Sequence, residues 1–313
     1  MKLVFDILRL LRPRQWIKNF AIFAAITFAG HLFDIDILAK IIEGFVVFCA
    51  LSSAIYIVND IFDVKKDRLH PYKKYRPLAH GDIPIPISFV IAFFLSFVSV
   101  ILASTITPAF FLLIIVYLIL QISYSIFLKN IAVIDILALA AGYILRVYAG
   151  ELASGFHISV WLLLTTISLS LFLAIGKRRS ELTLVSKLSL PNIEATRKSL
   201  SHYSERLLDV YASIFATSTF ISYALFTFLE NPSGFKLSLN LLMPEFLPAF
   251  FQRKWLMVTI IPVVYGIMRY MQDIYEKHEG ESPERVLLSD IPLLFTVAIW
   301  IISVIAIIYF VGA

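Results

Sequence analysis

The chain has 313 residues, of which 59% are hydrophobic and 16% are charged, and its mean hydropathy is +0.85. Soluble globular proteins carry about 25% charged residues, so this composition excludes that class and predicts a polytopic membrane protein. The net charge of +5 is assigned to basic cytoplasmic loops rather than to nucleic-acid binding. Because Cys49 is the one cysteine, a disulfide within the chain is excluded.

Nine apolar segments approach the ~20 residues that a helix needs to cross a bilayer. They cover residues 16–33, 36–58, 86–105, 108–128, 131–150, 158–176, 207–229, 254–274 and 289–311. We therefore predict an all-α fold that forms a single domain over residues 1–313. About nine transmembrane helices are expected to surround an active-site cavity that faces the cytoplasm.

The distribution of basic residues predicts how these spans are oriented. With a cytoplasmic N-terminus, most of the 27 Lys and Arg residues face the cytoplasm. The other side then holds Lys40, Lys236, Arg253 and Lys254. Loops rich in Lys and Arg stay on the cytoplasmic side, so the bias predicts a multi-pass protein of the cell membrane with its C-terminus outside.

The stretch NDIFDVKKDRLHPYKKYR, residues 59–76, carries the strongest chemical signal. On a helix, Asp60, Asp63 and Asp67 fall within about 60° of one another. Three carboxylates on one face repel unless a cation lies among them, and oxygen ligands of this kind suit Mg²⁺. We predict that these three aspartates bind Mg²⁺ and that Asn59 helps to bind the substrate. The alternative is a helix end with solvated charges.

A basic run follows the acidic residues at once and predicts a phosphate-binding loop. Its candidate ligand-binding residues are Arg68, His70, Lys73, Lys74 and Arg76. A basic loop beside an anionic leaflet is ordinary in membrane proteins, which is the alternative reading. Next to three carboxylates, the run favours a polyphosphate held by both metal and bases.

The short connection between the fourth and fifth apolar segments holds a second group of candidates. Lys129, near a helix start, is suited to hold an anion, and Tyr124 precedes it. Asp135 lies one turn inside the next span, where an unpaired carboxylate is costly and therefore indicates function. Arg146 shares its face about 16 Å further along the helix, too far to pair with it directly. We expect Arg146 to snorkel or to close a polar cavity.

Two further basic groups leave their alternatives open. Arg14 and Lys18 precede the first apolar segment beside Trp16, as either an interfacial anchor or a site for a lipid phosphate. Lys177 and Arg178 begin the second long polar loop, residues 177–206, and are candidate substrate-binding residues for the same reason.

With these motifs, the chain resembles the UbiA superfamily of intramembrane prenyltransferases. The shared features are nine spans, an N-D-x-x-D-x-x-x-D motif ending the second span, and an Asp-bearing motif at Asp135. Typical members carry D-x-x-x-D in the second motif, whereas Leu139 stands four residues after Asp135 here. The stretches LRPRQWIKN, LRVYAG and GKRRSE are similar to a branch that transfers a phosphoribosyl group.

This resemblance implies a Mg²⁺-dependent transfer of 5-phosphoribosyl from 5-phosphoribosyl 1-diphosphate to a polyprenyl (decaprenyl) phosphate for cell-wall arabinan synthesis. The catalytic candidates are Asp60, Asp63 and Asp135, the last to stabilise positive charge or orient a ribose hydroxyl. The expected anion ligands are Tyr124 and Lys129 for the 5-phosphate, and Arg14 and Lys18 for the lipid phosphate. The alternatives are prenyl transfer to an aromatic acceptor and a transporter. A homo-oligomer is left open.

Overall fold

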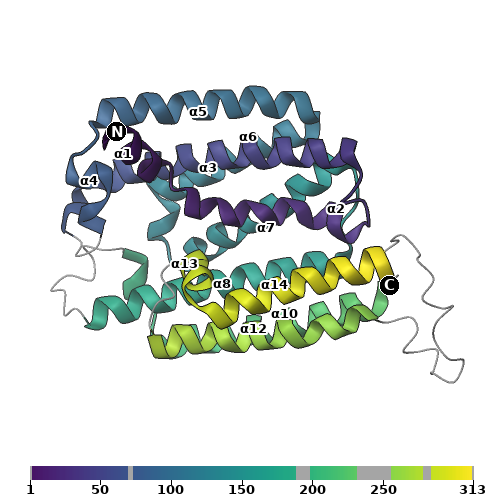
Figure 1. Cartoon of the computed structure of the whole chain (residues 1–313). Coiled ribbons are helices and arrows are strands. Elements are labelled where there is room, and N and C mark those ends of the chain that lie inside the picture. The colour runs from purple at the N-terminus through teal and green to yellow at the C-terminus, as the bar shows by residue number, and fades with distance from the viewer. Residues whose placement is uncertain (1, 70–72, 188–197, 231–254, 278–282, 312–313) are drawn as a thin grey trace, which may run out of the picture.

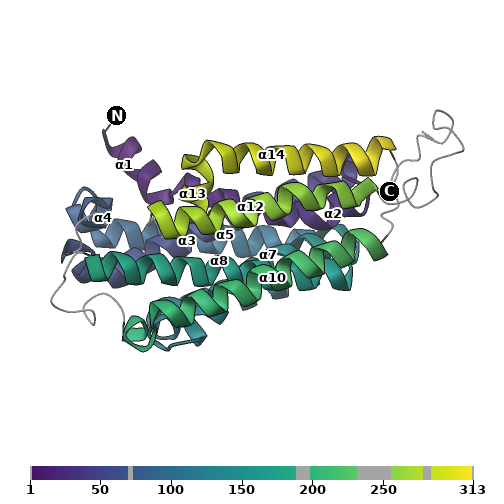
Figure 2. The ribbon, with the colours of Figure 1, turned by 90° about the horizontal axis from the view of Figure 1, so that it is seen from below.

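The computed structural model describes residues 2–69, 73–187, 198–230, 255–277 and 283–311. Within these ranges every regular element is a helix, as the sequence predicted. The long helices lie side by side in one bundle, with the N-terminus at one end of it and the C-terminus at the other (Figures 1 and 2).

The helices follow the predicted segments closely in the middle of the chain. They are α1 (Lys2–Leu11), η1 (Pro13–Phe23), α2 (Ala24–Phe28), α3 (Ile35–Leu69), η2 (Lys73–Tyr75), α4 (Pro77–His80), α5 (Ile85–Ile106), α6 (Pro108–Ile126), η3 (Leu128–Asn130), α7 (Ile134–Ser154), α8 (Val160–Lys187), η4 (Lys198–His202), α10 (Glu205–Leu229), η6 (Trp255–Thr259), α12 (Ile260–Gln272), η7 (Asp273–Lys277), α13 (Pro283–Ser289), α14 (Ile291–Ala306) and η8 (Ile307–Val311).

Seven of the described helices are long and apolar enough to cross a membrane. The two other predicted spans are broken: residues 16–33 form the end of the 3₁₀ helix η1 and the short helix α2, and residues 255–272 form η6 and α12. In α12, Pro262 lies in the first turn, where its missing N–H costs no helical hydrogen bond. The exact count of nine spans therefore stays a prediction.

Helix α3 is longer than predicted and carries the acidic motif beyond the predicted span end at residue 58. Its 35 residues correspond to about 50 Å, well above the ~30 Å of the hydrocarbon core. Lys66 and Arg68 lie in its last turn, where cations interact favourably with the helix dipole. The helix therefore continues through Asp67, and the aspartates lie on a helical face rather than at a helix end.

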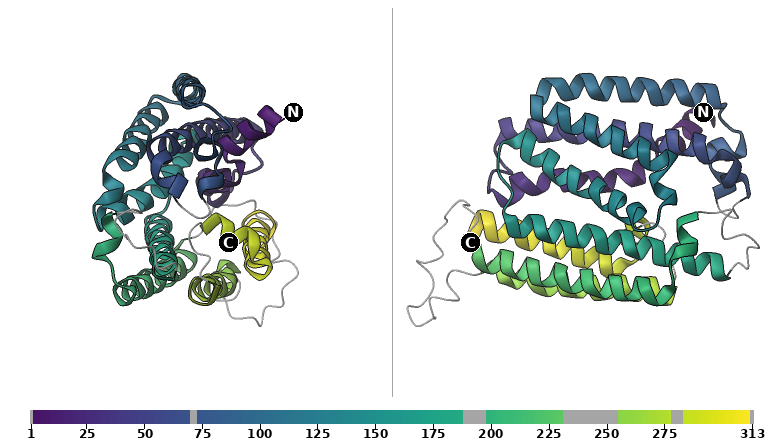
Figure 3. Two further views of the ribbon diagram at one scale, coloured as in Figure 1. Left: turned by 90° about the vertical axis from the view of Figure 1, so that its left-hand side faces the viewer. Right: turned by 180° about the vertical axis from the view of Figure 1, so that it is seen from behind.

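The apolar cores hold η1 and α7 in the middle of the bundle. One cluster packs Ile22 of η1 against Phe48 of α3, Phe110 of α6 and Ala149 of α7. A second packs α7 against α8, α10, α12 and α13. Figure 3 shows the two groups of helices end-on, with α5 at the outer edge of the first. Because α7 belongs to both clusters, residues on it face both groups.

Candidate active site

Asp60 and Asp67 are neutralised by two arginines, one from the segment before α3 in the chain and one from the segment after it. Arg12 Nη2 lies 2.5 and 2.6 Å from the two carboxylate oxygens of Asp60, which is 2% exposed. Arg76 Nη1 donates to Asp60 at 3.1 Å and to Asp67 at 2.6 Å. The guanidinium of Arg12 also lies 5.3 Å from the ring centre of Tyr56. Two acids and two bases thus form one compact ionic cluster.

Asp63 lies between these two acids in the sequence of α3 and is paired with a base from the connection between α6 and α7. Lys129 Nζ, from η3, donates to its two oxygens at 2.7 and 2.9 Å and to Asn59 Oδ1 at 3.4 Å. Six predicted site residues are therefore brought together, namely Asn59, Asp60, Asp63, Asp67, Arg76 and Lys129. Sequence reasoning had assigned Lys129 to a phosphate, and the structure places its ammonium directly against the acidic motif.

Local backbone geometry explains why the two arginines reach the aspartates. Arg12 has a left-handed conformation, with φ 53°, which turns the chain between α1 and η1 before Pro13. Arg76 caps α4 in an extended conformation before Pro77, and Gly81, with φ 94°, ends that helix after one turn. The sequence analysis did not select Arg12 for this site, because its partner Asp60 is 48 residues away.

The other residues of the basic run make different kinds of contact. Arg68 Nε donates to the carbonyl of Ala79 at 3.2 Å and so ties α4 to α3. Lys73 lies close enough to act electrostatically on Asp67. Lys74 is exposed, with its ammonium 5.1 Å from the ring centre of Tyr75. His70 lies outside the described residues.

Asp135 lies in a closed polar cluster and is 0% exposed. Its carboxylate accepts from Tyr203 at 2.6 Å and from Ser199 at 3.1 Å, and Arg178 Nε lies 3.7 Å away. Arg178, also 0% exposed, pairs with Glu181 at 2.5 Å. Burial and the hydrogen bond to Asp135 raise the pKa of Tyr203, so its hydroxyl stays a donor. The catalytic role of Asp135 stays a prediction.

Lys18 points inward and meets a residue that the sequence analysis did not select. Its Nζ lies 2.9 Å from Glu284 of α13 and donates to Gln15 Oε1 at 2.7 Å. Burial favours the protonated acid, but Lys18 and Lys177 outweigh it and lower the pKa of Glu284 to about 2. The neighbouring Trp16 donates to Ser53 of α3 at 3.0 Å, so this segment packs within the protein.

The remaining candidates are placed as follows. Arg14 is exposed, and Tyr124 is buried near the end of α6. Arg146 is buried in a polar cluster: Nε donates to Asn19 at 2.8 Å and Nη2 to Tyr117 at 2.5 Å. Its predicted role in closing a polar cavity stays a prediction. Leu139 packs against the apolar cluster around α7 and α8.

The donor set of the acidic motif fits Mg²⁺ by its chemistry. Asp60, Asp63 and Asp67 offer carboxylate oxygens on one helix face, and such oxygens are the ligands that Mg²⁺ prefers. Within the part of the chain that the structure describes, no three His, Cys, Asp or Glu side chains are gathered as a metal site. The carboxylates point toward Arg12, Arg76 and Lys129 instead, so a metal requires these long side chains to swing away.

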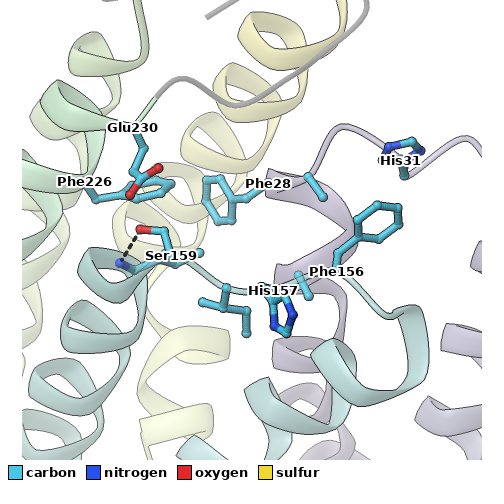
Figure 4. Close-up of a pocket in the computed structure, with 11 residues that line it drawn as sticks. Phe28, His31, Phe156, His157, Ser159, Phe226 and Glu230 are labelled. Carbon is cyan, nitrogen blue, oxygen red and sulfur yellow. Dashed lines mark hydrogen bonds between the residues drawn. The ribbon is translucent and has the colours of Figure 1, made fainter. Parts of the chain in front are cut away.

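A separate cavity of about 260 Å³ lies at the other end of the bundle, where α7 joins α8 (Figure 4). Phe28 and Phe226 pack edge to face across it at 5.1 Å, and His31 stacks on Phe156 at 4.3 Å. The cavity lies at the N-terminal end of α8, and this long helix runs from there toward the end of the bundle that carries the acidic motif. The cavity therefore does not belong to the candidate site.

The chain belongs to the UbiA prenyltransferase family, whose model matches residues 19–289. It is 35% identical to the decaprenyl-phosphate phosphoribosyltransferase of Mycolicibacterium smegmatis, over 98% of this chain and 94% of that protein. It is 33% identical to the protein of that name from Corynebacterium glutamicum, over 96% of this chain and 86% of that protein.

Solved structures show the same fold. A UbiA homologue from Archaeoglobus fulgidus bound to GPP and Mg²⁺ superposes with a TM-score of 0.67 at 22% identity, covering 96% of this chain and all of the homologue. The predicted all-α membrane fold and the family resemblance are thereby confirmed.

Proposed function

We propose that this protein transfers the 5-phosphoribosyl group from 5-phosphoribosyl 1-diphosphate to a polyprenyl phosphate and releases diphosphate. The observation that carries the proposal is the cluster of three aspartates and three bases at the end of α3. Full-length identity of 33–35% to decaprenyl-phosphate phosphoribosyltransferases supports the choice of substrates. The product is a lipid-linked pentose phosphate suited to cell-wall polysaccharide synthesis.

The charges of the cluster explain how it can accept a metal diphosphate. Three carboxylates and three bases are electrically balanced without a ligand. When Mg²⁺ and diphosphate enter together, the aspartates can hold the cation while Arg12, Arg76 and Lys129 donate to phosphate oxygens. Charge-assisted hydrogen bonds to phosphate are among the stronger polar contacts in proteins. The cluster then changes partners without leaving any buried charge unpaired.

The reaction follows from this arrangement. An oxygen of the lipid phosphate forms a bond to C1 of ribose while the bond from C1 to the diphosphate oxygen breaks, and the diphosphate keeps the electron pair. Asp60, Asp63 and Asp67 would hold Mg²⁺, which would supply positive charge to the leaving group. The lipid phosphate is anionic at neutral pH, so the attack needs no strong base. Arg12, Arg76 and Lys129 stabilise the departing charge.

The proposed donor is a soluble molecule of the cytoplasm, which supports an orientation with the acidic cluster on that side. We propose that the N-terminus and the acidic cluster face the cytoplasm and that the C-terminus lies outside. Basic residues concentrated on the loops at the same end support this orientation. The polyprenyl phosphate then reaches the site from the lipid, with its phosphate at the membrane surface.

Turnover of labelled donor tests the proposal. With Mg²⁺ and a polyprenyl phosphate, the purified protein is expected to convert labelled phosphoribosyl diphosphate into a lipid-extractable product. Asp60→Asn and Asp63→Asn should each lower kcat by about 10²–10³-fold, because the leaving group loses charge stabilisation. Asp36→Asn, at the exposed opposite end of the same helix, is the matched control and should leave kcat unchanged.

Two results would refute the proposal. One is that the unmutated protein forms no labelled lipid and that the Asp60→Asn and Asp63→Asn variants do not differ from it. The other is use of geranyl diphosphate with an aromatic acceptor in place of phosphoribosyl diphosphate, which would favour the prenyl-transfer alternative.

A further inference from the structure

Arg146 is a buried cation that no acid neutralises among the described residues. It is 5% exposed and lies about 18 Å along α7 from Ile134. Its guanidinium donates to Asn19 Oδ1 at 2.8 Å, to the Gly142 carbonyl at 2.6 Å and to the Tyr117 hydroxyl at 2.5 Å, all neutral acceptors. A charged side chain at this depth is costly and usually marks a functional site.

A second cation, Lys18, lies near the same aromatic ring as Arg146. The ring centre of Tyr143 is 5.7 Å from the Arg146 guanidinium and 6.0 Å from Lys18 Nζ. Lys18 is paired with Glu284 at 2.9 Å and with the neutral Gln15 at 2.7 Å. Glu284 neutralises Lys18 and not Arg146, so the group of Arg146, Lys18 and Glu284 keeps one net positive charge.

This cationic layer is joined to the acidic cluster by side chains of α3. Tyr56, one turn before Asp60, donates to Gln15 at 3.1 Å, and its ring lies beneath Arg12. Ser52, two turns or about 12 Å before Asp60, contacts Asn19 at 3.4 Å. Lys18, Tyr56 and Tyr143 all keep part of their surface exposed. The polar side chains therefore continue without a break from the acidic cluster to Lys18 and Arg146, which lie deeper in the bundle.

We propose that Arg146 and Lys18 form a binding site for a phosphate monoester, one to two helical turns deeper than the diphosphate site. The inference rests on the proposed function, in which both substrates carry such a phosphate besides the leaving diphosphate. A guanidinium has five N–H donors, and the three neutral acceptors leave donors for phosphate oxygens. The same charge disfavours a hydrocarbon chain here, so the layer favours a phosphate group over a prenyl group.

The ligand comes from one of two sources, the 5-phosphate of the sugar donor or the phosphate of the polyprenyl acceptor. Binding of ribose 5-phosphate and of polyprenyl phosphate to the full chain in detergent separates them. Arg146→Met is expected to weaken one of the two by about 10- to 100-fold, as loss of charged hydrogen bonds predicts. Affinity for inorganic diphosphate with Mg²⁺ should stay the same, because that ligand is held by the acidic cluster.

Two further variants make the result interpretable. Arg269→Met removes an arginine that is paired with Asp290 outside the site, and it should bind all three ligands normally. The double variant Lys18→Met with Glu284→Gln removes one cation and its acid while it keeps every hydrogen bond of Arg146. It should also weaken the same monoester, and it decides the question if Arg146→Met does not fold.

Unchanged affinity of either site variant for both monoesters would overturn the inference. Equal loss of diphosphate and monoester binding would also overturn it, because Arg146 would then be purely structural. A failure of the proposed function would look different from a failure of this inference. No lipid product would form, although ribose 5-phosphate would still bind and its binding would still depend on Arg146.

Discussion

At the scale of single residues, the pairing of charges decides what each acidic group contributes. Asp60 faces the partly exposed Arg12, and Asp63 is itself partly exposed beside the buried Lys129. Asp135, in contrast, is enclosed by Tyr203, Ser199 and Arg178. Asp135 thereby connects α7, η4 and α8, and Tyr203 also accepts the Val133 N–H at 2.6 Å. Carboxylates predicted from the same kind of motif thus occupy two different environments.

Glu284 gives a residue-scale prediction for pH. Its pKa falls from 4.5 to about 2 on folding, which at 1.36 kcal/mol per unit corresponds to about 3 kcal/mol. A lowered pKa contributes stability that is present above pH 4.5 and is lost as the pH falls toward 2. Glu284→Gln should therefore lower Tm clearly at pH 7, and the difference should shrink between pH 4.5 and 2.

Thermal unfolding in detergent across this pH range measures the effect. Glu276→Gln, at an exposed position in the neighbouring segment η7, should show almost no change in Tm at any pH. A constant Tm difference for Glu284→Gln down to pH 2 would mean that the ion pair with Lys18 does not stabilise the fold.

At the scale of elements, the contact between η1 and α7 assembles the deeper part of the site. A Cβ atom on Gly150 of α7 would lie 1.9 Å from the carbonyl oxygen of Ile22, so the two backbones touch. This close approach is what brings Lys18 and Asn19 of η1 next to Arg146. The first predicted span is broken into η1 and α2, and the η1 part packs closely against α7.

Gly150→Ala is expected to lower the unfolding free energy by about 1–3 kcal/mol, because the added methyl group meets backbone that has to shift. Gly266→Ala in α12 is the matched control, since its Cβ would have its nearest neighbour at 3.8 Å. That change should be neutral or stabilising by up to about 1 kcal/mol through helix propensity. Equal Tm values for the two variants would contradict the contact.

At the scale of the whole molecule, the acidic cluster and the cavity of Figure 4 lie toward opposite ends of the bundle (Figures 1 and 4). His157, with 93% of its side chain exposed, lies in the connection between α7 and α8, and Ser201 is exposed in η4, which follows α8 in the chain. If the proposed orientation is right, the membrane separates these two positions.

Single cysteines test this topology, because Cys49 is buried and is the one natural cysteine. A membrane-impermeant thiol reagent should label His157→Cys on intact cells and Ser201→Cys only after lysis. The unmutated protein, as control, should remain unlabelled. The reverse pattern would invert the orientation and place the candidate active site outside.

The sequence by itself determined the class of fold and the common helical face of the three aspartates. Backbone in lipid must satisfy its own hydrogen bonds, so the apolar runs had to be helices. The spacing of Asp60, Asp63 and Asp67 depends only on the helical repeat, so their common face could be predicted.

Only the tertiary structure decided which charges meet. Lys129 and Asp63 are 66 residues apart, and Gln15 and Glu284 are 269 apart. Such pairs depend on helix packing, which local periodicity does not encode. The breaks in the first and eighth predicted spans and the left-handed turn at Arg12 also depend on packing. A local pattern therefore fixes which face of a helix is polar, whereas the neighbouring helices determine what that face binds.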